Sequence, residues 1–296
     1  MKLAILLMCH KLPEQIRMFE EVMKNDNITI FIHLDKKSKI NPELIENSNV
    51  VILPEKYRKD VRWAQISQVD AELVLLRYAK QYGSYDFYWL CSGQDFPTRS
   101  PEAILDVLEK NEKANYLNLY PSENNALGRC NKYDKRNQIV FFSWMLSRKY
   151  VLRVLKRIVI EITGGYNRTF HIFQRKNATG MKFYFGSQWW CLNKKTVDWM
   201  RKYLKDHREY YMFFATCSTP DESFFHTLVM NSPYVEGVKD YLHYIDWSED
   251  KNSPKTLTIE DLEKIRDSGK LMARKFDISI DDNIVSCLFD SIKMNF

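Results

Sequence analysis

Short apolar runs alternate with amphipathic stretches along the first 120 residues. Runs of four to six apolar residues are typical of buried strands, and apolar positions three and four apart are typical of helices packed on a sheet. The sequence predicts strands at Leu3–Met8, Ile28–His33, Val50–Leu53, Phe87–Leu90 and Tyr116–Leu119, and a later one at Gly186–Leu192. It predicts helices at Pro13–Met23, from about Trp63 to Lys80, and after Ser100, which caps a helix with Pro101 at its first position. This alternation favours an α/β sandwich with a largely parallel central sheet flanked by helices.

Acidic residues follow two of these strands. Asp35 comes just after the second strand, and Ser92–Asp95 follow Phe87–Leu90. Ligands of open α/β sheets bind beyond the carboxyl ends of the strands, where both segments are expected to lie. The alternative roles are a turn residue for Asp35 and a helix-entry cap for Asp95.

Length and composition indicate one large domain or two small ones with a sizeable core. The chain has 296 residues, is 45% hydrophobic and contains only 9 Gly and 9 Pro, which argues against disorder or a long flexible linker. The six cysteines form no Cys-x-x-Cys pair and no zinc spacing, so we interpret them as thiols of a reducing compartment. The apolar run at the N-terminus is too short for a signal peptide, and no run reaches the length of a membrane span. We therefore expect a cytoplasmic protein, soluble or peripheral at the inner face of the membrane.

Positive charge is concentrated between Leu127 and Lys182. This segment holds 13 Lys and Arg against 2 acids, although the whole chain has a net charge of only +6. Within it, residues 143–162 combine apolar positions at helical spacing with interleaved Arg and Lys, which predicts a basic amphipathic helix. Such a helix suits a membrane surface or an anionic ligand, and a core helix with a solvated basic face is the equal alternative. No nucleic-acid-binding motif accompanies the charge.

The acidic pair Asp221-Glu222 precedes an aromatic helix, in the segment Thr219-Pro220-Asp221-Glu222. A carboxylate at a helix N-terminus is favoured in its ionised form, which would make it available as a proton acceptor. Taken alone, Thr219 and Glu222 fit a capping box better than a catalytic site.

Several motifs together resemble one family. They are His33-Leu34-Asp35-Lys36-Lys37-Ser38, Trp63, Leu90-Cys91-Ser92-Gly93-Gln94-Asp95-Phe96-Pro97, Gly186-Ser187-Gln188-Trp189-Trp190, Thr219-Pro220-Asp221-Glu222 and Ala273-Arg274-Lys275-Phe276-Asp277. In this order they are similar to the core-2/I-branching β-1,6-N-acetylglucosaminyltransferase and peptide O-xylosyltransferase family, glycosyltransferase family 14. The stretch from about 122 to 182 matches least. Eukaryotic members are anchored Golgi proteins with disulfides, and this chain shows neither feature, so we expect a bacterial member.

The resemblance implies a GT-A-like fold, a UDP-sugar donor, inversion at the anomeric carbon and catalysis without a metal. The sequence contains no Asp-x-Asp, the motif through which GT-A enzymes usually hold a divalent metal. Arg274 and Lys275 would neutralise the leaving diphosphate instead, since an Arg fork and a Lys ammonium both bind phosphate oxygens. A solvated basic pair is the alternative for these two residues.

The family match also implies individual roles. Glu222 would be the catalytic base, with Asp221 as a capping or orienting residue. Donor binding would involve Asp35, Lys37, Asp95 and Trp63, the last with core packing as an equal alternative. For the acceptor, aromatic faces suit a pyranose ring, and Asp246 could accept hydrogen bonds from sugar hydroxyls; the candidates are Trp189, Tyr244, Asp246 and Trp247.

We expect one glycosyltransferase domain over residues 1–296, with a nucleotide-binding half to about 120, an acceptor half to about 240, and a C-terminal segment closing on the diphosphate. The expected reaction transfers GlcNAc, with xylose or another hexose as alternatives, to a glycan or lipid-linked glycan of a bacterial surface polysaccharide. Two other classes stay open: a noncatalytic module that binds anionic lipid or glycan through the basic helix, and a glycan hydrolase that uses Asp221 and Glu222.

Overall fold

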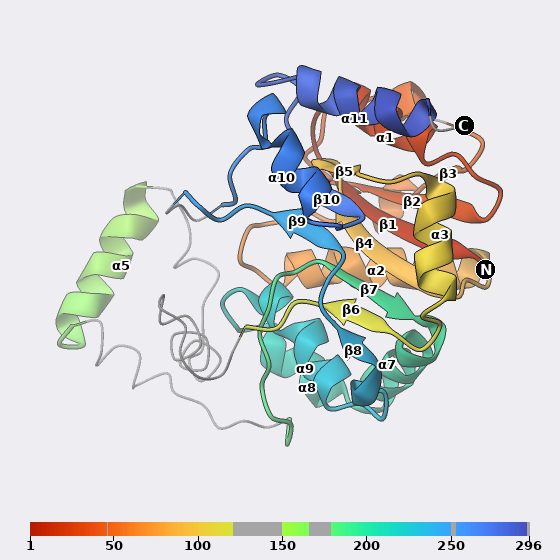
Figure 1. Ribbon diagram of the computed structural model, residues 1–296. Helices are drawn as coiled ribbons and strands as arrows, with labels where there is room; N and C mark the ends of the chain where they lie inside the picture. The colour runs from red at the N-terminus through yellow and green to blue at the C-terminus, as the bar shows by residue number, and fades with distance from the viewer. Residues whose placement is uncertain (46, 121–149, 166–178, 250–252, 295–296) are drawn as a thin grey trace.

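The structure is a computed structural model that describes residues 1–294 except 46, 121–149, 166–178 and 250–252. Its centre is a seven-stranded sheet of order β3-β2-β1-β4-β7-β6-β8 (Figure 1). The strands β3, β2, β1 and β4 are parallel, β7 runs antiparallel to its neighbours β4 and β6, and β8 is parallel to β6. The strands of this sheet are β1 (Leu3–Cys9), β2 (Ile28–Leu34), β3 (Val50–Ile52), β4 (Phe87–Ser92), β6 (Asn115–Leu117), β7 (Trp190–Asn193) and β8 (Val238–Lys239).

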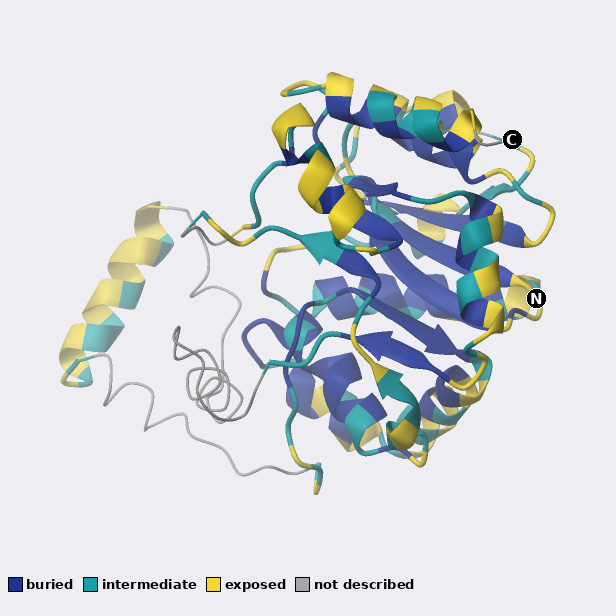
Figure 2. Ribbon diagram, viewed as in Figure 1, coloured by how far each residue is buried: buried dark blue, intermediate teal, exposed yellow. Residues whose placement is uncertain are grey.

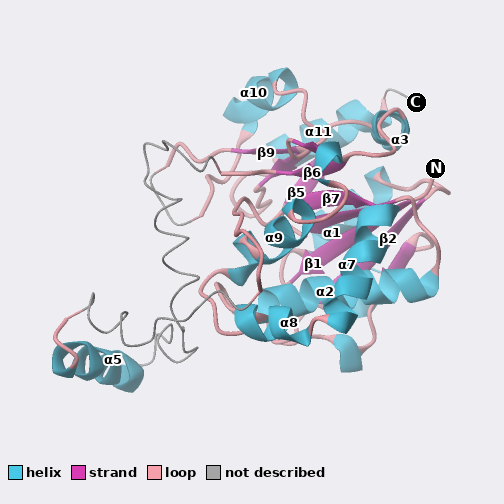
Figure 3. Cartoon of the chain, turned by 90° about the horizontal axis from the view of Figure 1, so that it is seen from below, coloured by secondary structure: helices cyan, strands magenta, loops and turns pink. Residues whose placement is uncertain are grey.

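Helices cover both faces of the sheet (Figure 2). Strand β1 needs cover on both faces, because successive side chains point to opposite sides of the sheet. Leu3, Ile5 and Leu7 pack into the core on one face, and Ala4 and Leu6 pack into the core on the other. The first face carries α1 (Pro13–Val22), α3 (Pro101–Glu109) and α11 (Asn283–Lys293), and the second carries α2 (Ser67–Tyr82), α7 (Lys194–Asp206), α8 (Arg208–Phe214) and α9 (Phe224–Met230). From below, α2, α7 and α8 lie side by side across the strands (Figure 3).

A small second sheet of order β5-β10-β9 brings the C-terminal region to the end of β4. Arg274 in β10 pairs with Asp95 in β5 and with Ile245 in β9. Residues far apart in the chain therefore meet at one edge of the fold. The strands are β5 (Asp95–Pro97), β9 (His243–Ile245) and β10 (Met272–Arg274), and α10 (Leu262–Asp267) precedes β10.

Most of the predicted elements are confirmed, including the α/β sandwich and the cap on α3, where Ser100 Oγ accepts a hydrogen bond from the Ala103 amide at 3.3 Å. Two elements start later than predicted. Helix α2 begins at Ser67 because the chain turns at Ala64, whose φ is 58°. Strand β7 begins at Trp190, so Gly186–Trp189 are a loop.

The basic helix of the sequence analysis is seen in part as α5 (Tyr150–Ile162), and its expected residues 143–149 lie outside the described residues. No residue of α5 is buried, and Tyr150 and Ile162 are 72% and 80% exposed. Figure 1 shows α5 apart from the two-faced sandwich. The core-helix alternative is therefore wrong for this segment. Within the described residues, no helix has both the length and the apolar character of a bilayer span.

Five cysteines in the described part of the chain are free thiols, four of them buried, whereas Cys130 lies outside it.

Candidate active site

A cavity of about 340 Å³ opens at the carboxyl edge of the central sheet. The ends of β1 and β4 form one side, and the loop before β7, the turn before α9 and the small sheet form the others. Its lining comprises Met8, His10, Trp63, Gln68, Ser92, Gln94, Tyr120, Ser187, Gln188, Trp189, Thr219, Asp221, Glu222, Ile245, Trp247, Ser253, Pro254, Arg274 and Lys275.

Glu222 ends a short 3-10 turn, Pro220–Glu222, immediately before α9. The expected capping box is not formed, because Thr219 has φ 51° and its hydroxyl donates to the Ser218 carbonyl rather than capping the turn. Glu222 is half-buried and lines the cavity. Its carboxylate is therefore placed where a substrate can reach it.

The backbone of Glu222 is tied to the loop before β7. The Gly186 amide donates a hydrogen bond to the Glu222 carbonyl at 2.9 Å. A Cβ atom at Gly186 would lie 1.7 Å from the Asn118 carbonyl oxygen, so only glycine allows this approach of three segments. Gly186 thus helps to fix the position of Glu222.

Asp221 belongs to a buried cluster beside Glu222. The Gln68 amide donates to Asp221 Oδ2 at 3.2 Å and to Gln188 Oε1 at 3.3 Å, and Gln188 donates to Glu72 Oε1 at 2.7 Å. Burial, and secondly the neighbouring Glu222 carboxylate, raise the pKa of Asp221 to about 8. Asp221 is therefore protonated at neutral pH and cannot itself accept a proton.

Arg274 reaches the cavity from the end of β10. Its Nη1 lies 3.1 Å from Asp95 Oδ1, and its guanidinium carbon lies 3.8 Å from the centroid of the Trp189 ring. Asp95 also accepts hydrogen bonds from the Ser92 amide at 2.9 Å and the Ser92 hydroxyl at 2.8 Å. Burial opposes ionisation of Asp95, but Arg274 and then His243 outweigh it and hold the pKa below its ordinary value. The guanidinium thus lies between the Asp95 carboxylate and the Trp189 ring.

Lys275 adds a second cation to the same wall. Its ammonium donates to Ser253 Oγ at 3.1 Å. Burial, followed by the nearby charges of Arg274 and Lys11, lowers the pKa of Lys275. Lys11 itself forms an ion pair with Asp277 at 2.5 Å. Positive charges that repel one another at a cavity wall are stabilised when an anion such as a diphosphate binds between them.

Among the described residues, one group has the spacing of a metal site, namely Cys91, Asp95 and His243, with ligand atoms within 4.8 Å of one another. All three are buried, and the Arg274 guanidinium already pairs with Asp95. A divalent cation here would meet a fixed positive charge, so these residues fit a metal poorly.

The structure brings six of the predicted site residues to the cavity and leaves five outside its lining. The six are Trp63, Trp189, Glu222, Trp247, Arg274 and Lys275, and the five are Asp35, Lys37, Asp95, Tyr244 and Asp246. Trp63 is 67% exposed, so it is not a core residue and stands at the rim.

The donor-side residues Asp35 and Lys37 form a turn just outside the cavity. Asp35 Oδ1 accepts a hydrogen bond from the Lys37 amide at 2.8 Å, which is the turn role weighed as an alternative. The Lys37 ammonium pairs with Asp60 at 2.8 Å. Asp95 is 1% exposed and pairs with Arg274, whose side chain lines the cavity.

The acceptor-side residues Tyr244 and Asp246 are not part of the cavity lining. Ile245 lines the cavity, so its neighbour Tyr244 projects to the opposite face of β9 and packs against the hydrophobic core. Asp246 Oδ1 accepts the Ser248 amide at 2.7 Å. Trp247 is the residue of this segment that reaches the cavity.

Sequence reasoning missed His10, Gln68 and Gln188 as lining residues and Lys11 as a nearby cation. His10 and Lys11 follow the first strand directly, so the rule that ligands bind at strand ends could have found them. No pattern in the sequence around Gln68 identified it, because its hydrogen-bond partner Asp221 is 153 positions away.

Comparisons with known proteins agree with this geometry. The family model described as Core-2/I-Branching enzyme matches residues 4–266. Xylosyltransferase 1 of Homo sapiens is 23% identical over 316 aligned residues, which cover 97% of this chain and 30% of the human protein. Xylosyltransferase 2 of Rattus norvegicus is 22% identical, covering 97% of this chain and 33% of the rat protein, and the xylosyltransferase of Ciona intestinalis is 24% identical, covering 93% and 32%.

The chain spans about a third of the length of these relatives. The family model nevertheless covers most of this chain, including the strand ends, the Gly186 loop and the turn that carries Glu222. The chain therefore belongs to the Core-2/I-branching enzyme family, glycosyltransferase family 14.

Proposed function

We propose that the protein is an inverting, metal-independent glycosyltransferase that moves a sugar from a UDP-sugar to a glycan hydroxyl. The observation that carries this proposal is one cavity lined by Glu222, Arg274 and Lys275. A carboxylate base and two cations are the groups that this reaction needs when no metal takes part.

In the proposed reaction, the acceptor hydroxyl attacks C1 of the donor sugar from the face opposite UDP. Its proton passes to the Glu222 carboxylate as the new C–O bond forms. The bond from C1 to the diphosphate oxygen breaks, and its electron pair leaves with UDP. Arg274 and Lys275 stabilise the charge that grows on the diphosphate, so the leaving group needs no protein acid.

The donor and acceptor follow from the cavity walls and from the relatives. We propose GlcNAc as the sugar, and the relatives named xylosyltransferases make UDP-xylose the first alternative, with another hexose beyond it. Trp63 and Trp247 at the rim suit the flat face of a nucleobase or pyranose. A bacterial surface glycan or its lipid-linked precursor is the proposed acceptor, and the proposed location is the cytoplasmic side of the membrane.

Helix α5 supports a peripheral membrane contact. Its exposed residues include Tyr150, Val151 and Ile162, and Arg153, Lys156 and Arg157 add positive charge to the same helix. Exposed apolar and cationic side chains on one helix suit the interface of an anionic bilayer.

Two measurements test the proposal. UDP should raise the unfolding temperature equally with and without EDTA. Glu222→Gln should lower transfer by at least a hundredfold while UDP binding is retained, because only the proton acceptor is lost. Glu236→Gln, an exposed change outside this cavity, is the matched control and should keep full transfer. Abolition of transfer by EDTA, or near-normal transfer by Glu222→Gln, contradicts the proposal.

A further inference from the structure

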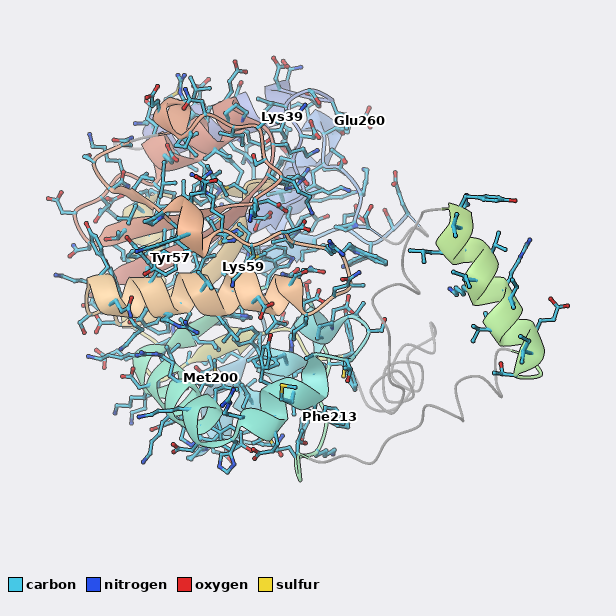
Figure 4. The ribbon with its side chains drawn as sticks, turned by 180° about the vertical axis from the view of Figure 1, so that it is seen from behind. Lys39, Tyr57, Lys59, Met200, Phe213 and Glu260 are labelled. Carbon is cyan, nitrogen blue, oxygen red and sulfur yellow. The ribbon has the colours of Figure 1, made fainter. Side chains whose placement is uncertain are left out.

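A second cavity, of about 610 Å³, lies between α2 and the pair α7–α8. It shares no lining residue with the candidate active site. Figure 4 shows this side of the molecule from behind, with α2 running alongside the helices that carry Met200 and Phe213, and with Lys59 near α2. Its volume is typical of a small-molecule site. The proposed transfer reaction does not explain this cavity.

The walls of the cavity carry five cations, contributed by α2, α7, α8 and the segment before α2. They are Lys59, Arg77, Arg201, Lys205 and Arg208. Within the described part of the chain, none of their side chains has an ion pair or a hydrogen bond. One acid, Asp70, also lines the cavity, where it accepts the Tyr211 hydroxyl at 2.7 Å, and Asp198 of α7 pairs with Lys80 at 2.6 Å. The lining therefore carries five cations against one carboxylate, a balance that favours an anionic ligand.

The floor of the same cavity is apolar. Leu73, Val74 and Leu76 come from α2, and Leu204 faces them from α7. Met212 at the edge is 63% exposed and adds apolar surface beside the cations. We call this combination of five cations and an apolar floor the basic groove.

We propose that the basic groove binds a phosphate group borne by a hydrocarbon chain, as in an anionic phospholipid. Arg201 and Arg208 offer forked donors for phosphate oxygens, and the apolar floor beside them would cover the first part of the chain. A site for free phosphate needs no apolar floor, and a site for a neutral hydrocarbon needs no cations. This inference does not depend on the proposed function, because lipid binding at the groove needs no transfer reaction.

The test uses the full chain and vesicles of phosphatidylcholine, with and without phosphatidylglycerol. Arg201→Glu/Lys205→Glu reverses two charges of the groove on α7. Lys195→Glu/Lys202→Glu reverses two exposed charges on the same helix outside the groove and is the matched control. We expect the groove variant to bind phosphatidylglycerol vesicles at least tenfold more weakly than the control variant. Equal binding by the two variants overturns the proposal.

Met212→Gln tests the hydrocarbon part, because this exposed residue can change without disturbing the core. It should weaken vesicle binding severalfold and leave the UDP-induced rise in unfolding temperature unchanged. Inorganic phosphate should compete only weakly with vesicles. Two results together would overturn the lipid assignment and assign the groove to a free anion. The first is tight binding of inorganic phosphate that the groove variant abolishes, and the second is vesicle binding that Met212→Gln leaves unchanged. Circular dichroism and unfolding temperatures are measured for every variant before binding is compared. They identify misfolding, which would also appear as loss of UDP binding in every variant.

Discussion

Arg274 Nη1 lies 3.1 Å from Oδ1 of Asp95, a carboxylate that is 1% exposed. The pair joins β10 to β5 and thus connects the C-terminal region to the end of the central sheet. Removing one partner of a buried pair leaves an uncompensated charge, which is costly. We therefore propose Asp95 as a positioning residue for the cation that we assign to the diphosphate.

Asp95→Asn should weaken UDP binding by roughly tenfold or more, because the shape of the side chain is kept while the charge that orients Arg274 is lost. Calorimetric titration with UDP measures this effect, and thermal unfolding reports the accompanying loss of stability. Asp106→Asn breaks an exposed pair with Lys110 and serves as the control. UDP affinity that is unchanged in Asp95→Asn would show that Arg274 is held by other contacts.

Trp189→Leu should lower kcat/KM by roughly two- to thirtyfold, because the indole face that stacks on the Arg274 guanidinium is lost. Steady-state kinetics with varied donor concentration measure it. Trp199→Leu on α7 removes an aromatic residue that stacks on Tyr203 outside the cavity. If both variants lose activity equally, the effect comes from general destabilisation and the assigned role of Trp189 is wrong.

Gly186→Ala should reduce transfer by more than tenfold and lower the unfolding temperature. The added methyl group cannot fit 1.7 Å from the Asn118 carbonyl, so the loop must move and take the Glu222 backbone with it. Transfer assays and thermal unfolding on the same preparation provide the comparison. Gly83→Ala, whose added Cβ would meet the Tyr85 side chain at 3.4 Å or more, should behave like the wild type. Full activity of Gly186→Ala would exclude the proposed link to Glu222.

Asp221→Asn should flatten the pH dependence of stability between about pH 4 and 8. The pKa of Asp221 is about 8 in the folded protein and lies near 4 in an unfolded chain, so the folded state holds one more proton in this window. The free energy of unfolding must therefore fall as the pH rises, by up to about 1.4 kcal/mol per pH unit from this group. Urea unfolding at a series of pH values measures the slope.

Glu20 provides an internal comparison for this experiment. Its pKa is also raised to about 8, mainly by burial, but it lies on α1 outside the active-site cavity. Glu20→Gln and Asp221→Asn should each flatten the stability slope, and Glu20→Gln should leave transfer unchanged. A stability slope that Asp221→Asn leaves as steep as in the wild type would contradict a protonated Asp221.

Local patterning predicted most of the fold because the signals that define an element are short in range. Residues close together in the sequence are enough to form the strand β1 and the helix cap at Ser100. The structure contains both features. The start of α2 was misplaced because Ala64 adopts a left-handed conformation that its residue type does not announce. The same local rules suggested a capping box at Thr219, which the structure does not form.

The candidate site was predictable where a residue carries its own chemistry. Glu222, Arg274 and Lys275 were assigned from residue type, motif and the absence of a metal motif, and they line one cavity. Tyr244 was chosen because an aromatic face suits a pyranose ring, but residue type does not say which face of a strand is directed into a cavity. The basic groove gave no signal, because its cations come from α2, α7, α8 and the segment before α2, which only the fold brings together.

The sequence alone determined the order of strands and helices, the ordered motifs of the family and the charged groups available for chemistry, because each depends on residues close together in the chain. Only the tertiary structure decided that Asp95 pairs with Arg274, that Gln68 donates a hydrogen bond to Asp221, and that α2 and α7 enclose a second cavity. Those relationships join residues that are more than a hundred positions apart, and the packing of the sheet and its helices sets which of them meet.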